Sequence, residues 1–168
     1  MSEVLEIVKN KLQAQFGQDV LSAEMLYDYP VFILQKNVVK DALTFLKSDK
    51  ELNFHFLTTM CGLHHPENSE DQEFGLMYQL HNMPKGWRIR IKTFMPKSDL
   101  DMPTITDLWK TANWMERQEY DFFGFNFVGH PNLTRILNMD EMNYFPMRKE
   151  YPLEDMSRED KNDKMFGR

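Results

Sequence analysis

Two segments in the first third of the chain place apolar residues at the three- and four-residue steps of an amphipathic helix. The first covers residues 3–16, with Gly17 as a natural stop. The second runs from Asn37, which we expect to cap the helix N-terminus, through Leu46. The apolar positions of the two stripes are Val4, Leu5, Val8, Leu12 and Phe16, and then Val38, Val39, Ala42, Leu43 and Leu46.

Five other segments have the alternating or continuous apolar pattern of β-strands. The last two flank a turn at residues 84–86 with no helical pattern between them, so we expect them to pair in antiparallel fashion. The predicted strands are residues 20–27, 31–35, 54–63, 74–80 and 87–93.

The last predicted strand has two chemically different faces. Trp87, Ile89, Ile91 and Thr93 share one face, and three cations share the other. We expect the cations Arg88, Arg90 and Lys92 to form a solvated outer surface. The alternative, that they form a docking surface for an acidic neighbour, remains open.

A third helix is predicted for residues 103–123, with Arg117 and Asp121 four residues apart and able to pair on its surface. After Gly124 no periodicity persists, and prolines interrupt the chain. The fold class predicted is α/β (α+β): a two-layer sandwich of a mixed, partly antiparallel sheet with helices on one face. We expect a core domain over residues 1–123 and an extended, partner-binding arm over residues 124–168.

The composition of the chain excludes some classes of function. A chain of 168 residues with 42% hydrophobic residues is long enough for one domain with a real core. The net charge of −6 argues against nucleic acid as a partner. The mean hydropathy of −0.58 and the short apolar run at residues 31–34 argue against a spanning helix, and residues 1–12 lack the apolar centre of an export signal. The lone Cys61 is expected to be a buried, inert thiol.

Candidate chemistry is sparse. His64 and His65, with Glu67 and Asp71, form the one metal-like cluster, although adjacent residues in an extended segment point in opposite directions. The glycines do not form a nucleotide-binding pattern. Glu116 and Glu119 resemble an acid–base pair, but structural salt bridges are the expected role. At His130-Pro131 we expect a hydrogen-bonded corner that places Leu133, Ile136 and Leu137 against the domain.

The run from Trp109 to Leu153 is dense in aromatic rings and charges, and its methionines 139, 142 and 147 are suited to adaptable packing in an interface. Three blocks stand out: ERQEYDFFG at residues 116–124, GHPNLTRIL at 129–137 and PMRKEYPL at 146–153. Together they resemble the C-type subunit (the 30 kDa subunit family) of the proton-translocating NADH–quinone oxidoreductase, respiratory complex I. The chain departs from the family pattern at Gln118, Thr134 and Glu150.

The resemblance implies a structural subunit of the peripheral arm, on the cytoplasmic face of the bacterial inner membrane. It implies no active site or cofactor in this chain, within a complex that uses FMN, Fe–S clusters, NADH and a quinone. Expected partners are the large D-type subunit and neighbouring Fe–S subunits, with no nucleic acid and with membrane association only through the complex. The residues assigned to the partner interface are Glu116, Arg117, Glu119, Asp121, Phe122, Phe123, Gly124, His130, Pro131, Arg135, Arg148, Lys149, Tyr151 and Pro152.

Two alternatives remain open. The chain resembles an equivalent adaptor subunit of a membrane-bound hydrogenase or a formate-oxidising complex almost as well. The other alternative is a small metal-dependent enzyme that uses His64, His65 and Glu67.

Overall fold

The computed structural model describes residues 2–151, and a five-stranded mixed sheet forms its centre. The strand order is β1-β2-β5-β4-β3, in which β2 and β5 are parallel and the other neighbours are antiparallel. This confirms the predicted fold class, including the antiparallel pairing of the last two predicted strands. The strands are β1 (Val20–Leu26), β2 (Tyr29–Leu34), β3 (Phe56–His64), β4 (Phe74–Asn82) and β5 (Trp87–Met95).

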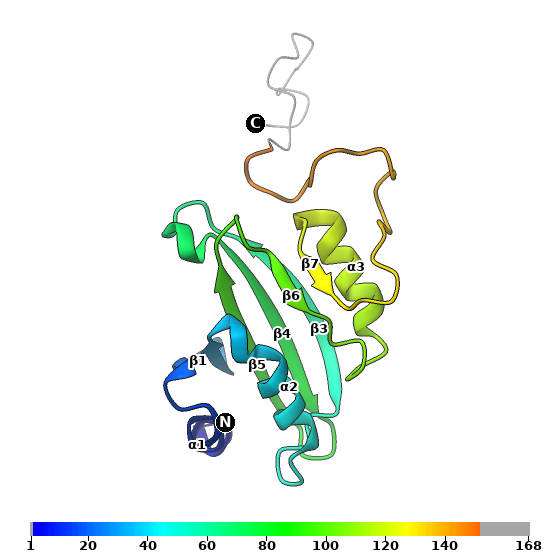
Figure 1. Cartoon of the computed structure of the whole chain (residues 1–168). Coiled ribbons are helices and arrows are strands. Elements are labelled where there is room, and N and C mark those ends of the chain that lie inside the picture. The colour runs from blue at the N-terminus through cyan, green and yellow to red at the C-terminus, as the bar shows by residue number, and fades with distance from the viewer. Residues whose placement is uncertain (1, 152–168) are drawn as a thin grey trace, which may run out of the picture.

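Three α-helices pack on the same face of this sheet. They are α1 (Ser2–Phe16), α2 (Val39–Ser48) and α3 (Ala112–Phe123), and Figure 1 shows α2 and α3 in front of the strands. Two short strands, β6 (Asp101–Pro103) and β7 (Asn126–Val128), pair in parallel beside α3. Single 3₁₀ turns occupy Gly17–Asp19, Lys36–Val38 and Glu70–Gln72.

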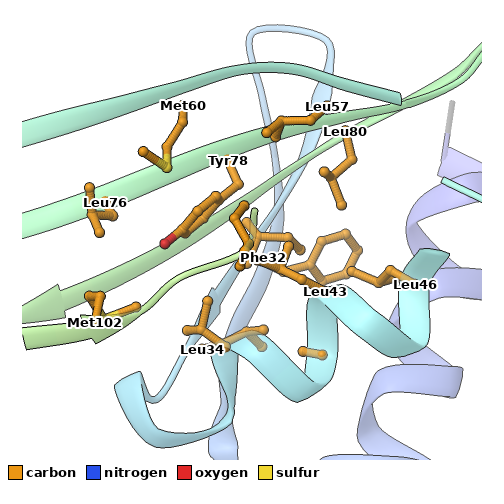
Figure 2. Close-up of a cluster of buried hydrophobic side chains, with 14 of the residues drawn as sticks. Phe32, Leu34, Leu43, Leu46, Leu57, Met60, Leu76, Tyr78, Leu80 and Met102 are labelled. Carbon is orange, nitrogen blue, oxygen red and sulfur yellow. The ribbon is translucent and has the colours of Figure 1, made fainter. Parts of the chain in front are cut away.

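The hydrophobic core lies between the sheet and the helices. Alternate residues of the central strands point into it, as the period of two predicts, and Figure 2 shows Tyr78 and Leu80 of β4 facing Leu43 and Leu46 of α2. Phe32 of β2 fills the space between these elements and is completely buried. Full burial of each such side chain stabilises the fold by about 1.5–3 kcal/mol.

Two sequence predictions about helices were wrong. Asn37 does not cap α2, because residues 36–38 form a 3₁₀ turn and Val38 takes the N-cap position with no side-chain hydrogen bond. The third helix begins at Ala112, not at residue 103. The segment before it belongs instead to β6 and its continuation, where the Thr104 N–H donates to the Val128 carbonyl oxygen.

The chain stays in the core after α3 ends. Phe125 is completely buried and Phe127 nearly so, and both belong to the same hydrophobic cluster as the sheet. From Gly129 to Tyr151 the structure contains no helix or strand, and this segment runs beside α3 (Figure 1). The division into a core and a partner-binding arm at residues 123–124 stays a prediction, but burial of these two rings inside the core was not anticipated.

Candidate partner interface

Helix α3 carries three carboxylates that are almost completely buried. Glu116, Glu119 and Asp121 have exposed fractions of 0%, 1% and 0%. Buried carboxylates are costly unless hydrogen bonds or ion pairs satisfy them. Each of the three accepts hydrogen bonds from a different part of the chain, so α3 connects segments that are far apart in sequence.

Glu116 binds the segment that follows β6. Its two carboxylate oxygens accept hydrogen bonds from the Ile105 N–H, at 2.7 Å, and from the Thr104 hydroxyl, at 2.6 Å. The His130 Nε2 atom lies 4.0 Å from the nearer oxygen. Burial raises the pKa of Glu116 to about 7, against the lowering effect of these two hydrogen bonds.

Glu119 binds the sheet. Its Oε2 atom accepts a 2.6 Å hydrogen bond from the Gly62 N–H of β3, and burial raises its pKa to about 7. A Cβ atom at Gly62 would lie 2.5 Å from the Phe123 ring and 2.6 Å from the Glu119 carboxylate. Glycine at this position therefore allows α3 to approach the strand. Contrary to the prediction, Glu119 forms no salt bridge within residues 2–151, and Glu116 has only His130, at 4.0 Å, as an ionic partner there. The donors to these two carboxylates are mainly backbone N–H groups and the Thr104 hydroxyl.

Asp121 holds the segment that runs beside α3. One oxygen accepts from the N–H groups of Ile136, Leu137 and Asn138 at 2.8–3.1 Å, and the other accepts from Arg135 Nη1 at 2.7 Å. Burial opposes ionisation, but the hydrogen bonds outweigh it and hold the pKa of Asp121 well below its usual range.

The predicted pair between Arg117 and Asp121 was wrong. Arg117 donates instead to the Thr134 carbonyl and hydroxyl oxygens and to the Arg135 carbonyl oxygen, all within 3.1 Å. Arg117 and Asp121 thus both contact the following segment instead of pairing with each other along the helix.

Gly124 ends α3 and makes room for the next turn of the segment. Its φ of +82° is left-handed, and its N–H donates to the Tyr120 carbonyl oxygen, which is the geometry of a helix C-terminal cap. A Cβ atom here would lie 2.6 Å from Arg148 Nη2 and 2.7 Å from the Phe145 ring. Arg148 stacks on Phe145 and donates a 2.7 Å hydrogen bond to the Phe123 carbonyl oxygen.

His64 has a structural partner on each ring nitrogen. The Lys149 N–H donates to its Nδ1 atom at 2.9 Å, and its Nε2 atom lies 3.0 Å from the Glu73 carboxylate. His65 pairs separately with Glu67. In residues 2–151 no group of three or more His, Cys, Asp or Glu side chains is arranged to hold a metal ion. The metal-like cluster on which the alternative of a metal-dependent enzyme rested is therefore not brought together in this part of the chain.

His130 forms a hydrogen-bonded corner, as expected. Its N–H donates to the Phe127 carbonyl oxygen, and its ring accepts at Nδ1 from the Asn132 N–H. The Nε2 atom then carries the proton and donates to the Asn113 carbonyl oxygen at 3.2 Å. Pro131, next to it, is exposed.

The remaining predicted interface residues differ in exposure. Phe123 is buried against β3 and Phe125. Arg117, Phe122, Arg135 and Arg148 are half-buried. Lys149 and Tyr151 are exposed, and Pro152 lies outside the described residues. Most of the predicted interface residues therefore hold the segment against α3, and only a minority of them are exposed enough to contact a partner.

Strand β7 and the segment after it expose six large apolar side chains, which we call the apolar surface. Met139 is 70% exposed and Leu137 is 64% exposed, so the prediction that Leu137 packs against the domain was wrong. Sequence reasoning identified the methionines of this segment as adaptable, but it missed Val128 and Leu137, which no periodicity distinguishes from core residues. The apolar surface consists of Val128, Leu137, Met139, Tyr144, Met147 and Tyr151.

Comparisons with known proteins agree on one family. Residues 32–157 match the family model described as the respiratory-chain NADH dehydrogenase, 30 Kd subunit. The C-type subunit of NADH-quinone oxidoreductase from Citrifermentans bemidjiense is 34% identical over 149 residues, which are 89% of this chain and 90% of that protein. A C-type subunit of the same enzyme from Rhizobium etli, the form numbered 2, is 34% identical over 143 residues, 84% of this chain and 74% of that protein.

Two solved structures have the same fold. A trypsin-resistant fragment (1–134) of Nqo5 is 28% identical, with a TM-score of 0.64 over 79% of this chain and 98% of the fragment. A chain of the membrane-bound sulfane sulfur reductase, an archaeal respiratory membrane complex, is also 28% identical, with a TM-score of 0.71 over 88% of this chain and 85% of that chain.

The fold defines the class of this protein: it is an α/β subunit of the kind found in these two solved structures. The chain belongs to the 30 kDa subunit family of respiratory-chain NADH dehydrogenase, which includes the C-type subunits of NADH–quinone oxidoreductase. Among residues 2–151 we find no helix with the length and apolar character needed to cross a membrane.

Proposed function

We propose that this chain is a structural subunit of the peripheral arm of an NADH–quinone oxidoreductase, with no cofactor or active site of its own. It fixes the position of its sister subunits, chiefly the large D-type subunit and the neighbouring Fe–S subunits, at the cytoplasmic face of the inner membrane. In this way it supports the coupling of NADH oxidation and quinone reduction to proton translocation. The observation that carries the proposal is an apolar surface held in place by buried carboxylates.

The apolar surface is suited to a protein partner. Six large apolar side chains are exposed on β7 and on the segment that follows it, where the ring centres of Tyr144 and Tyr151 lie 5.1 Å apart. A concentration of exposed apolar side chains marks a candidate interaction site. Tyrosine and methionine account for four of the six, and both are enriched in interfaces. Burial of such rings in a partner's pocket contributes on the order of 2 kcal/mol each at a hot spot.

Anchoring by Asp121 and Arg148 lowers the entropy lost on association. A segment without helix or strand must normally be ordered when it binds, and this ordering weakens the affinity. Here one carboxylate receives three backbone N–H groups, and Arg148 fixes the turn near Phe145. The segment is therefore ordered before the partner arrives.

The buried carboxylates support a structural role better than a catalytic one. Glu116 and Glu119 face backbone N–H groups in the interior, at positions that a substrate would reach only by displacing α3. The pKa values near 7 follow chiefly from burial, to which the charge of Asp107 adds for Glu116, and structural carboxylates show such shifts as well as catalytic ones.

The test is assembly of the complex in cells that carry altered chains. Replacing Leu137, Met139 and Met147 by Ala is expected to reduce recovery of the complex on native gels, with little change in the melting temperature of the free chain. A matched control replaces Leu21, Met25 and Tyr27 by Ala, since these exposed apolar residues lie on or beside the edge strand β1. Equal assembly with both triple variants would refute the proposal.

The absence of a bound cofactor is tested separately. Elemental analysis and absorption spectra of the purified chain are expected to show no stoichiometric zinc, iron or flavin. One metal ion or flavin per chain, retained after dialysis, would overturn this part of the proposal.

A second candidate function is the equivalent subunit of a related respiratory membrane complex. The similarity to a chain of an archaeal sulfane sulfur reductase favours it, because that complex has a chain of the same fold. Identification of the subunits that co-purify with the native chain in mild detergent distinguishes the two, since an NADH-oxidising complex brings an NADH-binding flavin subunit with it.

A further inference from the structure

The second face of the sheet, opposite the helices, has no helix packed on it among residues 2–151. The strand register arranges its side chains in rows across the strands. One row joins Ile33, Lys92, Met77 and Cys61. The next joins Glu24 at the sheet edge with Val31, Arg90, Gln79 and Thr59, so Glu24 lies on this face two strands away from Arg90. The rows at either end join Phe94, Gly75 and Leu63, and Arg88, His81 and Phe56. We call this surface the basic face.

The basic face has a central line of three cations, with apolar Val31 and Ile33 on the β2 side and with Met77, Gln79 and His81 on the β4 side. Lys92 lies between Ile33 and Met77, which are half-buried although no helix covers them. Cys61, at the end of this row, is half-buried and therefore more exposed than predicted. Burial, and to a smaller extent the negative charge of Glu119, raise the pKa of its thiol. The surface thus combines cations with half-buried apolar side chains, which a partner could cover further.

The charged side chains of this sheet are almost all cationic. The chain has 26 acidic residues, yet the five strands contain only one carboxylate, Glu24 of the edge strand β1. In the part of the chain that the structure describes, no carboxylate lies within 4.0 Å of the charged groups of Arg88, Arg90 or Lys92. Other lysines and arginines of the chain do form such pairs, including Lys11, Lys36, Lys97 and Arg135.

Arg90, at the centre of the line, is held in position. Its Nε atom donates a 3.0 Å hydrogen bond to the Gln79 side-chain oxygen, and its guanidinium lies 4.5 Å from the centre of the Tyr29 ring. These contacts order the side chain in advance and leave its terminal N–H groups for an acceptor outside residues 2–151. A guanidinium presented in this way matches the planar geometry of a carboxylate.

We infer that the basic face binds an acidic protein surface of a sister subunit, at a site separate from the apolar surface. The inference rests on the proposed function, since it names a second contact within the same complex. Alternate residues of a strand are about 6.6 Å apart, and acidic residues four apart on a helix are about 6 Å apart, so one acidic helix can pair with the whole line. The apolar residues on both sides would bury its flanks.

An anionic membrane or a nucleic acid fits this surface less well. Recognition of anionic lipid typically uses clusters of about 4–8 lysines and arginines, and the line holds three. A chain with a net charge of −6 is repelled as a whole by either of these anionic partners. A protein partner needs only local complementarity and also uses the apolar neighbours.

The direct test is zero-length cross-linking of the native complex. A water-soluble carbodiimide joins the Lys92 amine to a carboxylate in direct contact, forming an amide with loss of water. We expect mass spectrometry to find Lys92 joined to an Asp or Glu of a sister subunit. Lys92→Arg keeps the charge and removes the amine, so it is expected to abolish this cross-link while the complex assembles normally.

Charge reversal tests the contribution of the face to assembly. The variant R88E/R90E/K92E is expected to weaken association with the sister subunits about tenfold or more, with the larger loss at low salt. The matched control K9E/K50E/K110E changes the net charge of the chain by the same amount, at lysines that form no ion pair within residues 2–151. The control is expected to assemble like the wild type.

Three results would overturn the inference. In the first, the complex assembles, Lys92 gives no cross-link to a sister subunit and charge reversal behaves like the control, so the proposed function stands alone. In the second, the free chain binds vesicles containing phosphatidylglycerol through Arg88, Arg90 and Lys92, which would assign the face to lipid. In the third, the wild-type chain recovers no sister subunits, and the proposed function fails together with the inference.

Discussion

The Asp121 carboxylate and the Arg135 guanidinium form an ion pair, at 2.7 Å, that joins α3 to the segment beside it. The Asp121 side chain is completely buried and that of Arg135 is 9% exposed. Arg135 also donates to the Asp121, Met142 and Tyr144 carbonyl oxygens. The pair thus fixes the path of a stretch that has no helix or strand of its own, and the apolar surface depends on it.

Replacing Asp121 by Asn is expected to destabilise the chain by about 3 kcal/mol, because Arg135 loses its charged partner in a buried site. The N–H groups of residues 136–138 should also exchange with solvent faster. Thermal denaturation and amide hydrogen exchange measure the two effects. Asp71→Asn, at an exposed position, is the control, and an equal change in both variants would contradict the anchoring role.

Replacing Gly124 by Ala separates backbone strain from crowding. Gly86 has a similar positive φ but no atom within 4 Å of an added Cβ, so Gly86→Ala should cost only the strain, about 1 kcal/mol. Gly124→Ala should cost at least about 2 kcal/mol, because its Cβ would also collide with Arg148 and Phe145. Urea denaturation of both variants measures the difference, and equal costs would mean that the segment adjusts freely.

Stability should fall as the pH rises from about 4.5 to about 7. In this interval the unfolded chain has ionised its glutamates, while Glu116 and Glu119 in the folded chain still hold protons because their pKa values are about 7. The free energy of unfolding should therefore decrease by up to a few kcal/mol and then level off. The double variant E116Q/E119Q should lose this slope, whereas E6Q/E70Q, at exposed positions, should keep it.

Below pH 4 the opposite dependence is expected. The pKa of Asp121 is lowered in the folded chain, so the unfolded chain binds the proton first and stability falls as the pH drops through the acid range. Chemical denaturation at a series of pH values should show this acid loss in the wild type and a smaller loss in Asp121→Asn. An identical acid slope in both proteins would assign it to other carboxylates.

Arg148 and Tyr151 should behave differently, although both are in the same motif. Arg148→Ala removes a hydrogen bond and the stacking on Phe145, and we expect it to lower the stability of the free chain by about 1–3 kcal/mol. Tyr151 is exposed, so Tyr151→Ala should change the free chain by less than about 1 kcal/mol and reduce assembly of the complex. Melting curves and native gels measure the two, and equal melting temperatures for both variants would contradict the distinction.

Much of the fold could be predicted because its signals are local. The periods of two and 3.6 located the five main strands and the first two helices within a few residues, and the missing helical pattern between β4 and β5 predicted their antiparallel pairing. The three sequence blocks identified the family. The start of α3 was misplaced because residues 103–111 look helical in period. Instead, the N–H groups of Thr104 and Ile105 donate to β7 and to Glu116, and the residues after them form turns.

The sequence by itself determined which residues form the sheet, which helices are amphipathic and which family the chain belongs to. Only the tertiary structure decided which hydrogen-bond partners the charged residues of α3 have. A carboxylate in a helical motif has the same sequence signature whether it pairs with an arginine four residues away or accepts N–H groups from a distant loop. The difference depends on burial and on the path of segments more than ten residues away, which no local pattern contains. For the same reason Glu119 meets β3 and Asp121 meets residues 136–138 only after the chain has folded.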